Sequence, residues 1–385
     1  MNPKIASTSA YYLAFIILGM VIAAEGPAIP WLAEHTASPI EQISLIFVFG
    51  SFGYLIGSYI GGLAYDRVAG HRFMSIILLT LALSAALVPI ASSLPILLTV
   101  LFVFGLTKGA LDVGGNTLLM WIHGDGVGPY MNGLHASFGV GSFTSGLIAA
   151  RVISLTGDIN WIFWTFALLC LPLAAWIWFI PNPAPRAAPA EHHNAPLPVI
   201  PVLVMGLCFV VYVGAETGYG SWLYTYATRL GLENEITAAY LTSAFWGFFT
   251  LGRLLGIPIS TRIRPRLILI ADLMGCFLSL GILLLWRDSA TALWIGSILL
   301  GVCMASIFPT MLTLAEERMH VTGAITGWFL VGSGLGGMIL PWGIGQLFER
   351  VGPYSMAMMV LASLAANLVF VFWFSSLKKS PSLAG

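Results

Sequence analysis

The sequence predicts an all-α membrane protein with twelve transmembrane helices, and three observations support that prediction. Of the 385 residues, 58% are hydrophobic and only 8% are charged. Soluble domains have about 25% charged residues, so the charged side chains are too few to cover a water-soluble globule. Apolar runs of about 20 residues, the length that crosses a bilayer, recur along the whole chain. The third observation is an internal repeat, which divides these runs into two sets of six.

Twelve segments have the length and composition of membrane spans, and short connections rich in Gly, Pro, Asp or Arg separate them. They are residues 9–30, 41–64, 72–92, 94–120, 129–153, 159–180, 198–228, 236–258, 265–286, 289–315, 321–347 and 353–376. The first run is longer than the apolar core of a signal peptide, about 7–15 residues. We therefore interpret it as a retained helix.

The longest connection, residues 181–197, predicts the division into domains. Its five prolines are typical of an extended linker. We expect an N-terminal six-helix bundle at 1–180, this linker, and a C-terminal six-helix bundle at 198–385. His192 and His193 in the linker suggest metal binding only weakly, and we predict no metal site and no cofactor.

Basic residues in the loops predict the orientation. A cytoplasmic N-terminus places ten of them inside and four outside. The inner set is Lys4, Arg67, Arg72, Arg186, Arg262, Arg264, Arg266, Arg318, Lys378 and Lys379, and the outer set is Arg151, Arg229, Arg287 and Arg350. This excess predicts that both termini are cytoplasmic. We expect a monomer in a bacterial-type plasma (inner) membrane.

Composition also excludes several classes of function. The formal net charge is zero, which argues against a broad basic face for nucleic acid. The four cysteines lie far apart within apolar runs, so neither a disulfide framework nor a CxxC metal site is expected. No combination of nucleophile, base and orienting residue is evident, and we predict that the chain is not an enzyme.

The two halves of the sequence match at offsets of 191 to 195 residues. Matched pairs are Gly57 with Gly252, Gly139 with Gly332, and Glu25 with Glu216. Such similar offsets indicate two parallel six-helix bundles related by an axis along the membrane normal. Chance similarity is the alternative, because glycine is frequent here.

Two loop segments are candidates for gating. The loop after the second span contains Gly62, Asp66, Arg67, Gly70 and Arg72. Its glycines allow close helix approach, and its aspartate can pair with arginines or with a helix N-terminus at the cytoplasmic rim. In the second half, we expect Arg253 to form a gating ion pair with Asp272 or with Glu316–Glu317. The alternative is an arginine that extends to the interface without a partner.

Five ionisable residues lie near the centres of spans: Glu25, Lys108, Asp112, Glu216 and Asp272. Each costs at least about 2.5–3.5 kcal/mol at such a depth, which makes each a functional candidate. If the halves are symmetric, Glu25 and Glu216 face one central cavity from opposite sides.

The fourth span has a polar stripe formed by Lys108, Asp112 and Asn116 at spacings of four. Three interpretations remain open. Lys108 and Asp112 can pair on their own helix. Asp112 can instead be protonated part of the time and couple proton entry to transport. Lys108 can also bridge to Glu25 on the first span.

Candidate cargo-binding residues lie on several spans. Tyr212 and Tyr219 share a helix face with Glu216, Trp222 follows, and a carboxylate with aromatic rings suits a polyhydroxylated ligand. An interfacial aromatic belt is the alternative. In the fifth span, Asn132 can donate to and accept from hydroxyls, while His135 is either a proton relay or a structural residue. We expect Trp246 and Trp328 to line the cavity.

These residues resemble a known family. The loop Gly62-Leu-Ala-Tyr-Asp66-Arg67-Val-Ala-Gly70-His71-Arg72 resembles the signature loop of the major facilitator superfamily, with one inserted residue. Within that superfamily, segments in five spans resemble the fucose–galactose–proton and glucose–mannose–proton symporters. They are Asp112-Val-Gly-Gly-Asn116, Asn132-Gly-Leu-His135-Ala-Ser-Phe-Gly139-Val-Gly141, Tyr212-Val-Gly-Ala-Glu216-Thr-Gly-Tyr-Gly-Ser-Trp222, Ser306-Ile-Phe-Pro309-Thr, and Gly332-Ser-Gly-Leu-Gly-Gly337-Met-Ile-Leu-Pro341.

The resemblance implies the major facilitator fold and alternating access. It implies that acids in spans one and four, here Glu25 and Asp112, are linked to protons, and that Asn132 touches sugar. Lys108 is a departure from that branch. We therefore expect proton-coupled uptake of a neutral hexose or related polyol, with Asn116, Asn132, His135 and Glu216 holding the cargo. Sodium coupling, export of amphipathic compounds or lipids, and a ligand sensor without transport are the alternatives.

Overall fold

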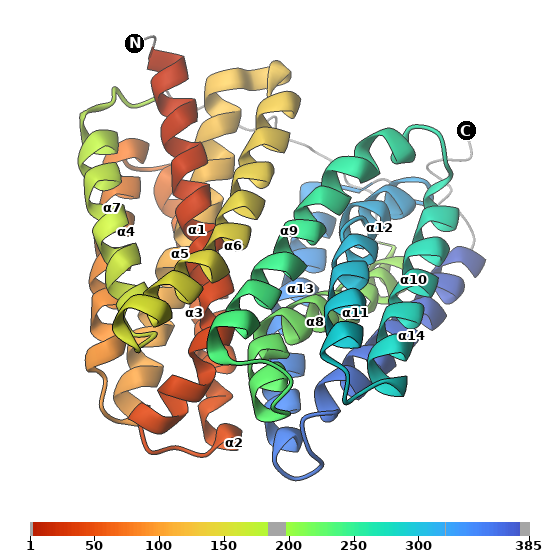
Figure 1. Ribbon diagram of the computed structural model, residues 1–385. Coiled ribbons are helices and arrows are strands. Elements are labelled where there is room, and N and C mark those ends of the chain that lie inside the picture. The colour runs from red at the N-terminus through yellow and green to blue at the C-terminus, as the bar shows by residue number, and fades with distance from the viewer. Residues whose placement is uncertain (1–2, 184–197, 320, 378–385) are drawn as a thin grey trace. The chain divides into compact units, whose positions relative to one another are not determined.

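The structure, a computed structural model, describes residues 3–183, 198–319 and 321–377, and the regular secondary structure in these ranges is helical (Figure 1). The first half contains α1 (Pro3–His35), α2 (Ile40–Ile43), α3 (Leu45–Tyr65), α4 (Gly70–Leu87), α5 (Leu94–His123), α6 (Gly128–Thr156) and α7 (Trp161–Phe179), with short 3-10 turns at Val88–Ile90 and Gly124–Gly126. The second half contains α8 (Val199–Arg229), α9 (Glu235–Ser260), α10 (Pro265–Leu285), α11 (Ala290–Met304), α12 (Ile307–Glu316), α13 (Gly323–Phe348) and α14 (Ser355–Ser376). Most of the predicted linker, with Arg186, His192 and His193, lies outside the described residues, as do Lys378 and Lys379.

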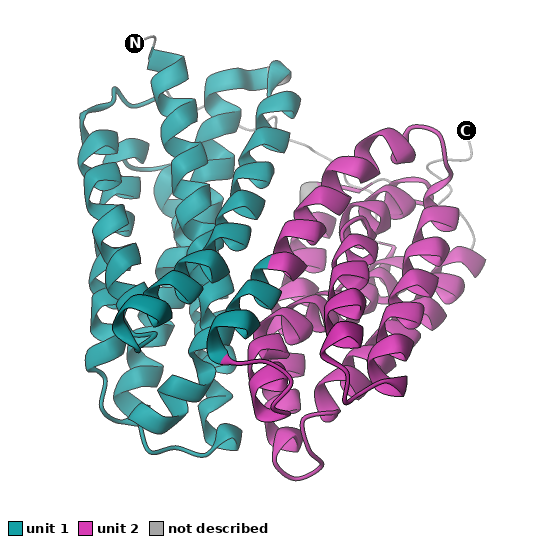
Figure 2. Ribbon diagram, viewed as in Figure 1, with its two compact units in different colours: residues 1–190, 235–243 teal, residues 191–234, 244–385 magenta. Residues whose placement is uncertain are grey.

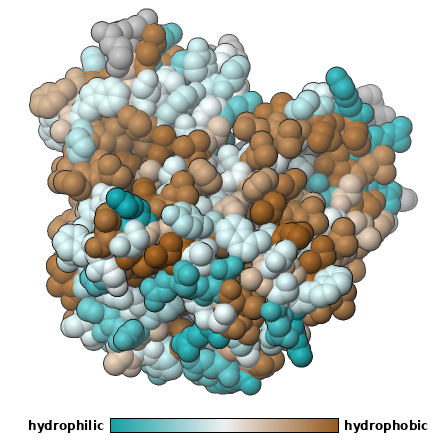
Figure 3. Space-filling view, viewed as in Figure 1, coloured by the Kyte–Doolittle hydropathy of each residue, from teal (hydrophilic) through white to brown (hydrophobic). Residues whose placement is uncertain are grey.

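The helices confirm an all-α, multi-pass membrane protein. In the described part of the chain, eleven stretches are long and apolar enough to cross a bilayer. The remaining predicted span, α9, forms a helix of 26 residues, but it is less apolar because it contains Arg253 and several Ser, Thr and Gly residues. Large apolar side chains such as Phe179, which is 83% exposed, face outward, and Figure 3 shows broad apolar areas on the visible face, with polar residues gathered toward its lower edge. Such a surface is expected where lipid replaces water.

The chain divides into two compact units, shown in Figure 2. Unit 1 comprises residues 1–190 and 235–243, and unit 2 comprises residues 191–234 and 244–385. The chain therefore changes unit three times: in the linker region, just before α9, and within α9, whose first nine residues group with unit 1.

Within unit 1, glycines bring pairs of helices into backbone contact. A Cβ at Gly57 of α3 would lie 1.9 Å from the carbonyl oxygen of Leu106 on α5, and a Cβ at Gly141 of α6 would lie 2.0 Å from that of Ile16 on α1. Small residues allow this approach, which gives membrane helices their packing contacts. The close approach of α3 and α5 allows the Tyr54 hydroxyl of α3 to reach Asp112 of α5.

Unit 2 repeats this packing pattern. Gly252 on α9 approaches the carbonyl oxygen of Val302 on α11, and Gly336 on α13 approaches that of Val210 on α8. Gly57 and Gly252 are 195 residues apart, and so are Gly141 and Gly336. Equivalent helices therefore pack through equivalent glycines in the two units.

The packing register corrects one sequence match. At an offset of 195, Glu25 is equivalent to Gly220, and Glu216 is equivalent to Val21. The match of Glu25 with Glu216 is thus displaced by four residues, about one helical turn. The two acids lie on equivalent helices but not at equivalent depths.

Substitution of Gly57 tests the role of these glycines. Gly57→Ala should lower the free energy of unfolding by about 1–3 kcal/mol, because the new methyl group overlaps the backbone of α5. Gly281→Ala is the matched control, since a Cβ there has no neighbour within 4 Å. Unfolding of both purified variants in detergent measures the difference. Equal stability of the two variants would contradict this account of the packing.

Candidate functional site

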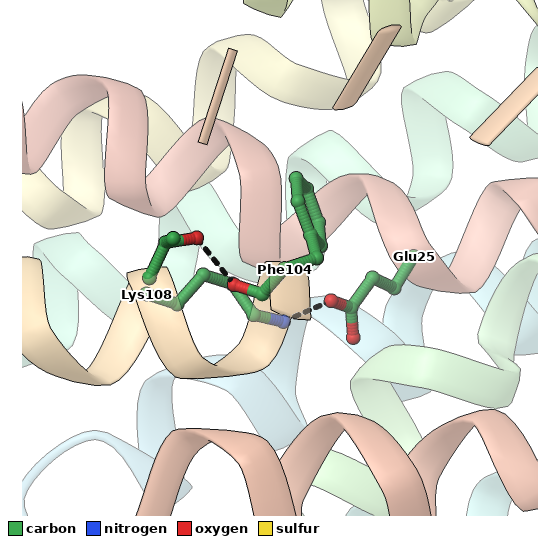
Figure 4. A network of polar contacts seen from close by, with 4 residues as sticks. Glu25, Phe104 and Lys108 are labelled. Atoms are coloured by element: carbon green, nitrogen blue, oxygen red, sulfur yellow. Dashed lines mark hydrogen bonds and ion pairs between the residues drawn. The ribbon is translucent and has the colours of Figure 1, made fainter. Parts of the chain in front are cut away.

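The buried charges of unit 1 form an ion pair between two helices. Lys108 on α5 and Glu25 on α1 point toward each other (Figure 4), and Lys108 Nζ donates to Glu25 Oε1. The Lys108 side chain is only 6% exposed and that of Glu25 is 22% exposed. Lys108 Nζ also lies 5.1 Å from the centroid of the Phe104 ring, within range of a cation–π interaction. Of the sequence-based alternatives for Lys108, the structure shows the bridge to Glu25 and not the local pair with Asp112.

Asp112 has neutral partners. The Tyr54 hydroxyl on α3 donates to Asp112 Oδ2, and Asn116 Nδ2 donates to Asp112 Oδ1 at 2.9 Å. Both carboxylate oxygens therefore accept a hydrogen bond. Sequence reasoning missed Tyr54, although a tyrosine between Gly53 and Gly57 in an otherwise apolar span was a usable signal.

A small cavity borders the ion pair inside unit 1. Its lining residues are Glu25, Leu32, Ile46, Gly50, Leu101 and Phe163. Its volume of about 10 Å³ corresponds to about one water molecule. The Glu25 carboxylate therefore faces a mostly apolar space that accommodates one small particle.

The α6 candidates divide into exposed and buried residues. Asn132 and His135 lie near the start of α6 and are exposed, and the His135 ring meets Phe15 of α1 edge-on with centroids 6.1 Å apart. Gly139 and Ser142 are buried against α1. The predicted polar stripe therefore has an open end and a packed end.

In unit 2, Glu216 of α8 is buried within electrostatic range of the Arg253 guanidinium of α9. Arg253 of α9 stacks over Phe249, with 4.5 Å from its Cζ to the ring centroid. Arg253 Nε and the indole nitrogen of Trp246 are buried and have no hydrogen-bond partner among the described residues. This part of unit 2 thus has one acceptor group, the Glu216 carboxylate, and two donors without a partner in the described chain, Arg253 Nε and the Trp246 indole nitrogen.

The expected gating ion pair of Arg253 is not formed by the described residues. Asp272 accepts a hydrogen bond from Ser306, at the break between α11 and α12. Glu316 and Glu317 are exposed at the end of α12. Arg253 instead lies over the Phe249 ring of its own helix, within electrostatic range of Glu216 on α8, which spacing along α9 does not indicate.

Three aromatic residues that we expected at the cargo site connect α8 to its neighbours instead. Tyr212, Tyr219 and Trp222 have no exposed surface. Their side chains hydrogen-bond the Met304 carbonyl at 2.6 Å, the Ser297 hydroxyl at 2.7 Å and the Pro341 carbonyl at 2.9 Å, respectively. In this structure they are core residues of unit 2. Trp246 is nearly buried, whereas Trp328 of α13 is 58% exposed.

The loop between α3 and α4 is anchored by a residue that we did not select. Asp66, Arg67 and Arg72 are exposed, Gly62 is part-buried near the end of α3, and Gly70 begins α4 against Leu118. His71 is fully buried, and its ring nitrogens contact the Tyr11 hydroxyl at 2.5 Å and the Ile180 carbonyl at 3.1 Å. Its position among the basic residues of the loop was the available signal.

Comparisons with known proteins agree with this architecture. The sequence profile of the Major Facilitator Superfamily matches residues 11–341. Sodium-dependent glucose transporter 1A of Mus musculus is 30% identical over 87% of this chain and 88% of its own length. Sodium-dependent glucose transporter 1 of Xenopus laevis is 31% identical over 85% of this chain and 73% of its own length.

Solved structures show the same fold. The nucleoside transporter NupG superimposes with a TM-score of 0.77 at 14% identity, over 97% of this chain and 99% of that chain. The D-xylose-proton symporter gives 0.73 at 11% identity, over 95% and 97% of the two chains.

Trp222→Phe tests the structural role of the α8 aromatic residues. The variant keeps a ring against Phe348 but leaves the Pro341 carbonyl without its donor, which should lower the free energy of unfolding by about 0.5–1.5 kcal/mol. Trp328→Phe, at an exposed position, should leave stability unchanged. Denaturation in detergent and cargo binding are measured on both. Weakened binding by Trp222→Phe at unchanged stability would show that Trp222 touches cargo.

Proposed function

Because the chain belongs to the major facilitator superfamily, we propose that it is a secondary active transporter that moves a neutral hexose-type sugar or related polyol by proton-coupled alternating access. Relatives named as glucose transporters, at about 30% identity over most of both chains, support the sugar class. The charge distribution of the loops supports cytoplasmic termini in a bacterial-type plasma membrane. The observation that carries the proposal is the buried Glu25–Lys108 pair with Asp112 one turn away.

The two acids of unit 1 have different partners, which suits a coupling mechanism. Glu25 is neutralised by an ammonium group, whereas Asp112 is held by hydroxyl and amide donors. A proton on Glu25 removes the charge that holds Lys108. Because Asp112 lies four residues along the same helix face, it is the alternative partner for the released ammonium. Proton binding thereby favours one of two arrangements of α1 and α5, as a coupled transporter requires.

The unused donors of unit 2 suit cargo. A buried donor without an acceptor costs about 1–3 kcal/mol, so Trp246 and Arg253 gain stability when a ligand supplies acceptors. A sugar hydroxyl accepts from these groups and donates to Glu216. Within unit 1, taken by itself, Asn116, Asn132 and His135 are the residues we propose for contact with sugar hydroxyls.

Sodium coupling is the second candidate. It is favoured by the relatives, which are named sodium-dependent. Carboxylates serve either ion, and the coupling ion is decided by the gradient that drives accumulation.

Substitution of the acids tests proton coupling. Glu25→Gln and Asp112→Asn should each abolish sugar accumulation driven by a pH gradient, because neither amide binds a proton in this range, while sugar exchange persists. Proteoliposomes with an imposed pH gradient or sodium gradient provide the measurement. Asp272→Asn is the matched control, because Asp272 is also an acid within a span, and it should retain accumulation. Accumulation by both test variants at the wild-type level would refute the assignment, and accumulation driven only by sodium would favour the second candidate.

Substitution of the donors tests the cargo contacts. Trp246→Phe and Arg253→Met should each raise the KM for sugar by about tenfold, which corresponds to the loss of about one hydrogen bond. Uptake at several sugar concentrations gives the KM, with Trp222→Phe as an aromatic control on unit 2. An unchanged KM in both variants would remove these residues from the cargo site.

A further inference from the structure

We propose that the Lys108 ammonium occupies a monovalent-cation site at Glu25, so that the chain supplies from its own side chain the cation that this buried carboxylate requires. This inference rests on the ion coupling proposed at Glu25 and does not depend on the identity of the cargo. It concerns what Glu25 binds when Lys108 is absent.

The contacts of Lys108 are those of a bound cation. Its Nζ meets a Glu25 oxygen on one side and lies over the Phe104 ring on another. Carboxylate oxygen and an aromatic face are both favourable neighbours for a positive charge. The nearby Thr107 hydroxyl donates to the Phe104 carbonyl at 2.8 Å and therefore does not donate to Glu25.

No other acid in the described contacts shares this ammonium. Asp112 is the next acid along α5, but its two oxygens accept from Tyr54 and Asn116. Since the Lys108 side chain is only 6% exposed, water contributes little to its solvation. Its charge is therefore matched by Glu25, and the charge of Glu25 is matched by Lys108.

The space that Glu25 lines is large enough for a small cation. The cavity that borders it holds about one water-sized particle and is otherwise lined by apolar residues and Gly50. Removing the ammonium leaves a partly buried carboxylate within a membrane span without its counter-charge, which is unfavourable unless another charge replaces it. A proton or a sodium ion, the two monovalent cations of suitable size, is the expected replacement.

The test is Lys108→Met, which preserves the length of the side chain and removes its charge. Thermal unfolding of the purified full chain in detergent is followed in sodium chloride and in N-methylglucamine chloride at equal ionic strength, and again over a pH series. The melting temperature of the variant should rise by about 3 °C more than that of the wild type with sodium or with acid, because the wild-type ammonium competes with either cation for Glu25. The sodium arm and the acid arm identify which cation binds.

Two further variants separate the cation site from general damage. Glu25→Gln combined with Lys108→Met removes both charges and should lose the added response. Lys108→Arg keeps the charge and should respond like the wild type. The titratable groups around Lys108 are Glu25 from α1, Asp112 from α5 and Tyr54 from α3. From α7, the residue that lines the cavity at Glu25 is Phe163, which does not titrate. Because the double variant retains Asp112 and Tyr54, any pH response from these groups cancels in the comparison.

Three outcomes would overturn the proposal. Lys108→Met could respond to neither sodium nor acid, the double variant could respond as strongly as Lys108→Met, or the wild type could show the same response. If Lys108→Met cannot be purified in standard buffer, its recovery in sodium or acid buffer supports the site. Failure of both buffers to recover it, while the double variant folds, counts against the site.

Discussion

Neutralising charge in a low-dielectric interior is the constraint on which this structure depends. A charged side chain within the bilayer requires a partner of opposite sign or a hydrogen-bonding environment. Glu25 and Lys108 satisfy this requirement for each other across α1 and α5. Asp112 satisfies it with neutral donors, and Arg253 lies over the Phe249 ring within electrostatic range of Glu216. The role proposed for each residue follows from the partner that balances its charge.

Glycine packing makes those short contacts possible and also shows how the two units diverged. Both units join equivalent helices through glycines 195 residues apart, such as Gly57 and Gly252. Within this shared frame, unit 1 has its buried base on α5, whereas unit 2 has Arg253 on α9, the helix equivalent to α3. The units therefore share a scaffold and differ in where their charges lie. In the proposed function, the coupling acids Glu25 and Asp112 accordingly lie in unit 1, and the donors that lack a partner among the described residues, on Trp246 and Arg253, lie in unit 2.

The fold was predictable from the sequence because the length and apolarity of a span are local properties. The low apolarity of α9 also has a local cause, because this helix contains Arg253 and several polar residues. The site was predictable only in part. Spacing along one helix shows that Lys108 and Asp112 share a face, but it does not show which neighbouring helix covers that face. The same limit applies to Tyr219 and Trp222, which lie on the same helix as Glu216. Spacing along α8 does not show that their side chains are buried and hydrogen-bond α11 and α13, respectively.

A double-mutant cycle on Glu25 and Lys108 tests the central claim most directly. Unfolding free energies of the wild type, Glu25→Gln, Lys108→Met and the double variant give the coupling between the two side chains. The account predicts that each single variant is less stable than the double variant, with a coupling of about 1–3 kcal/mol. Additive losses, with a coupling near zero, would show that the two residues do not neutralise each other and would contradict the account.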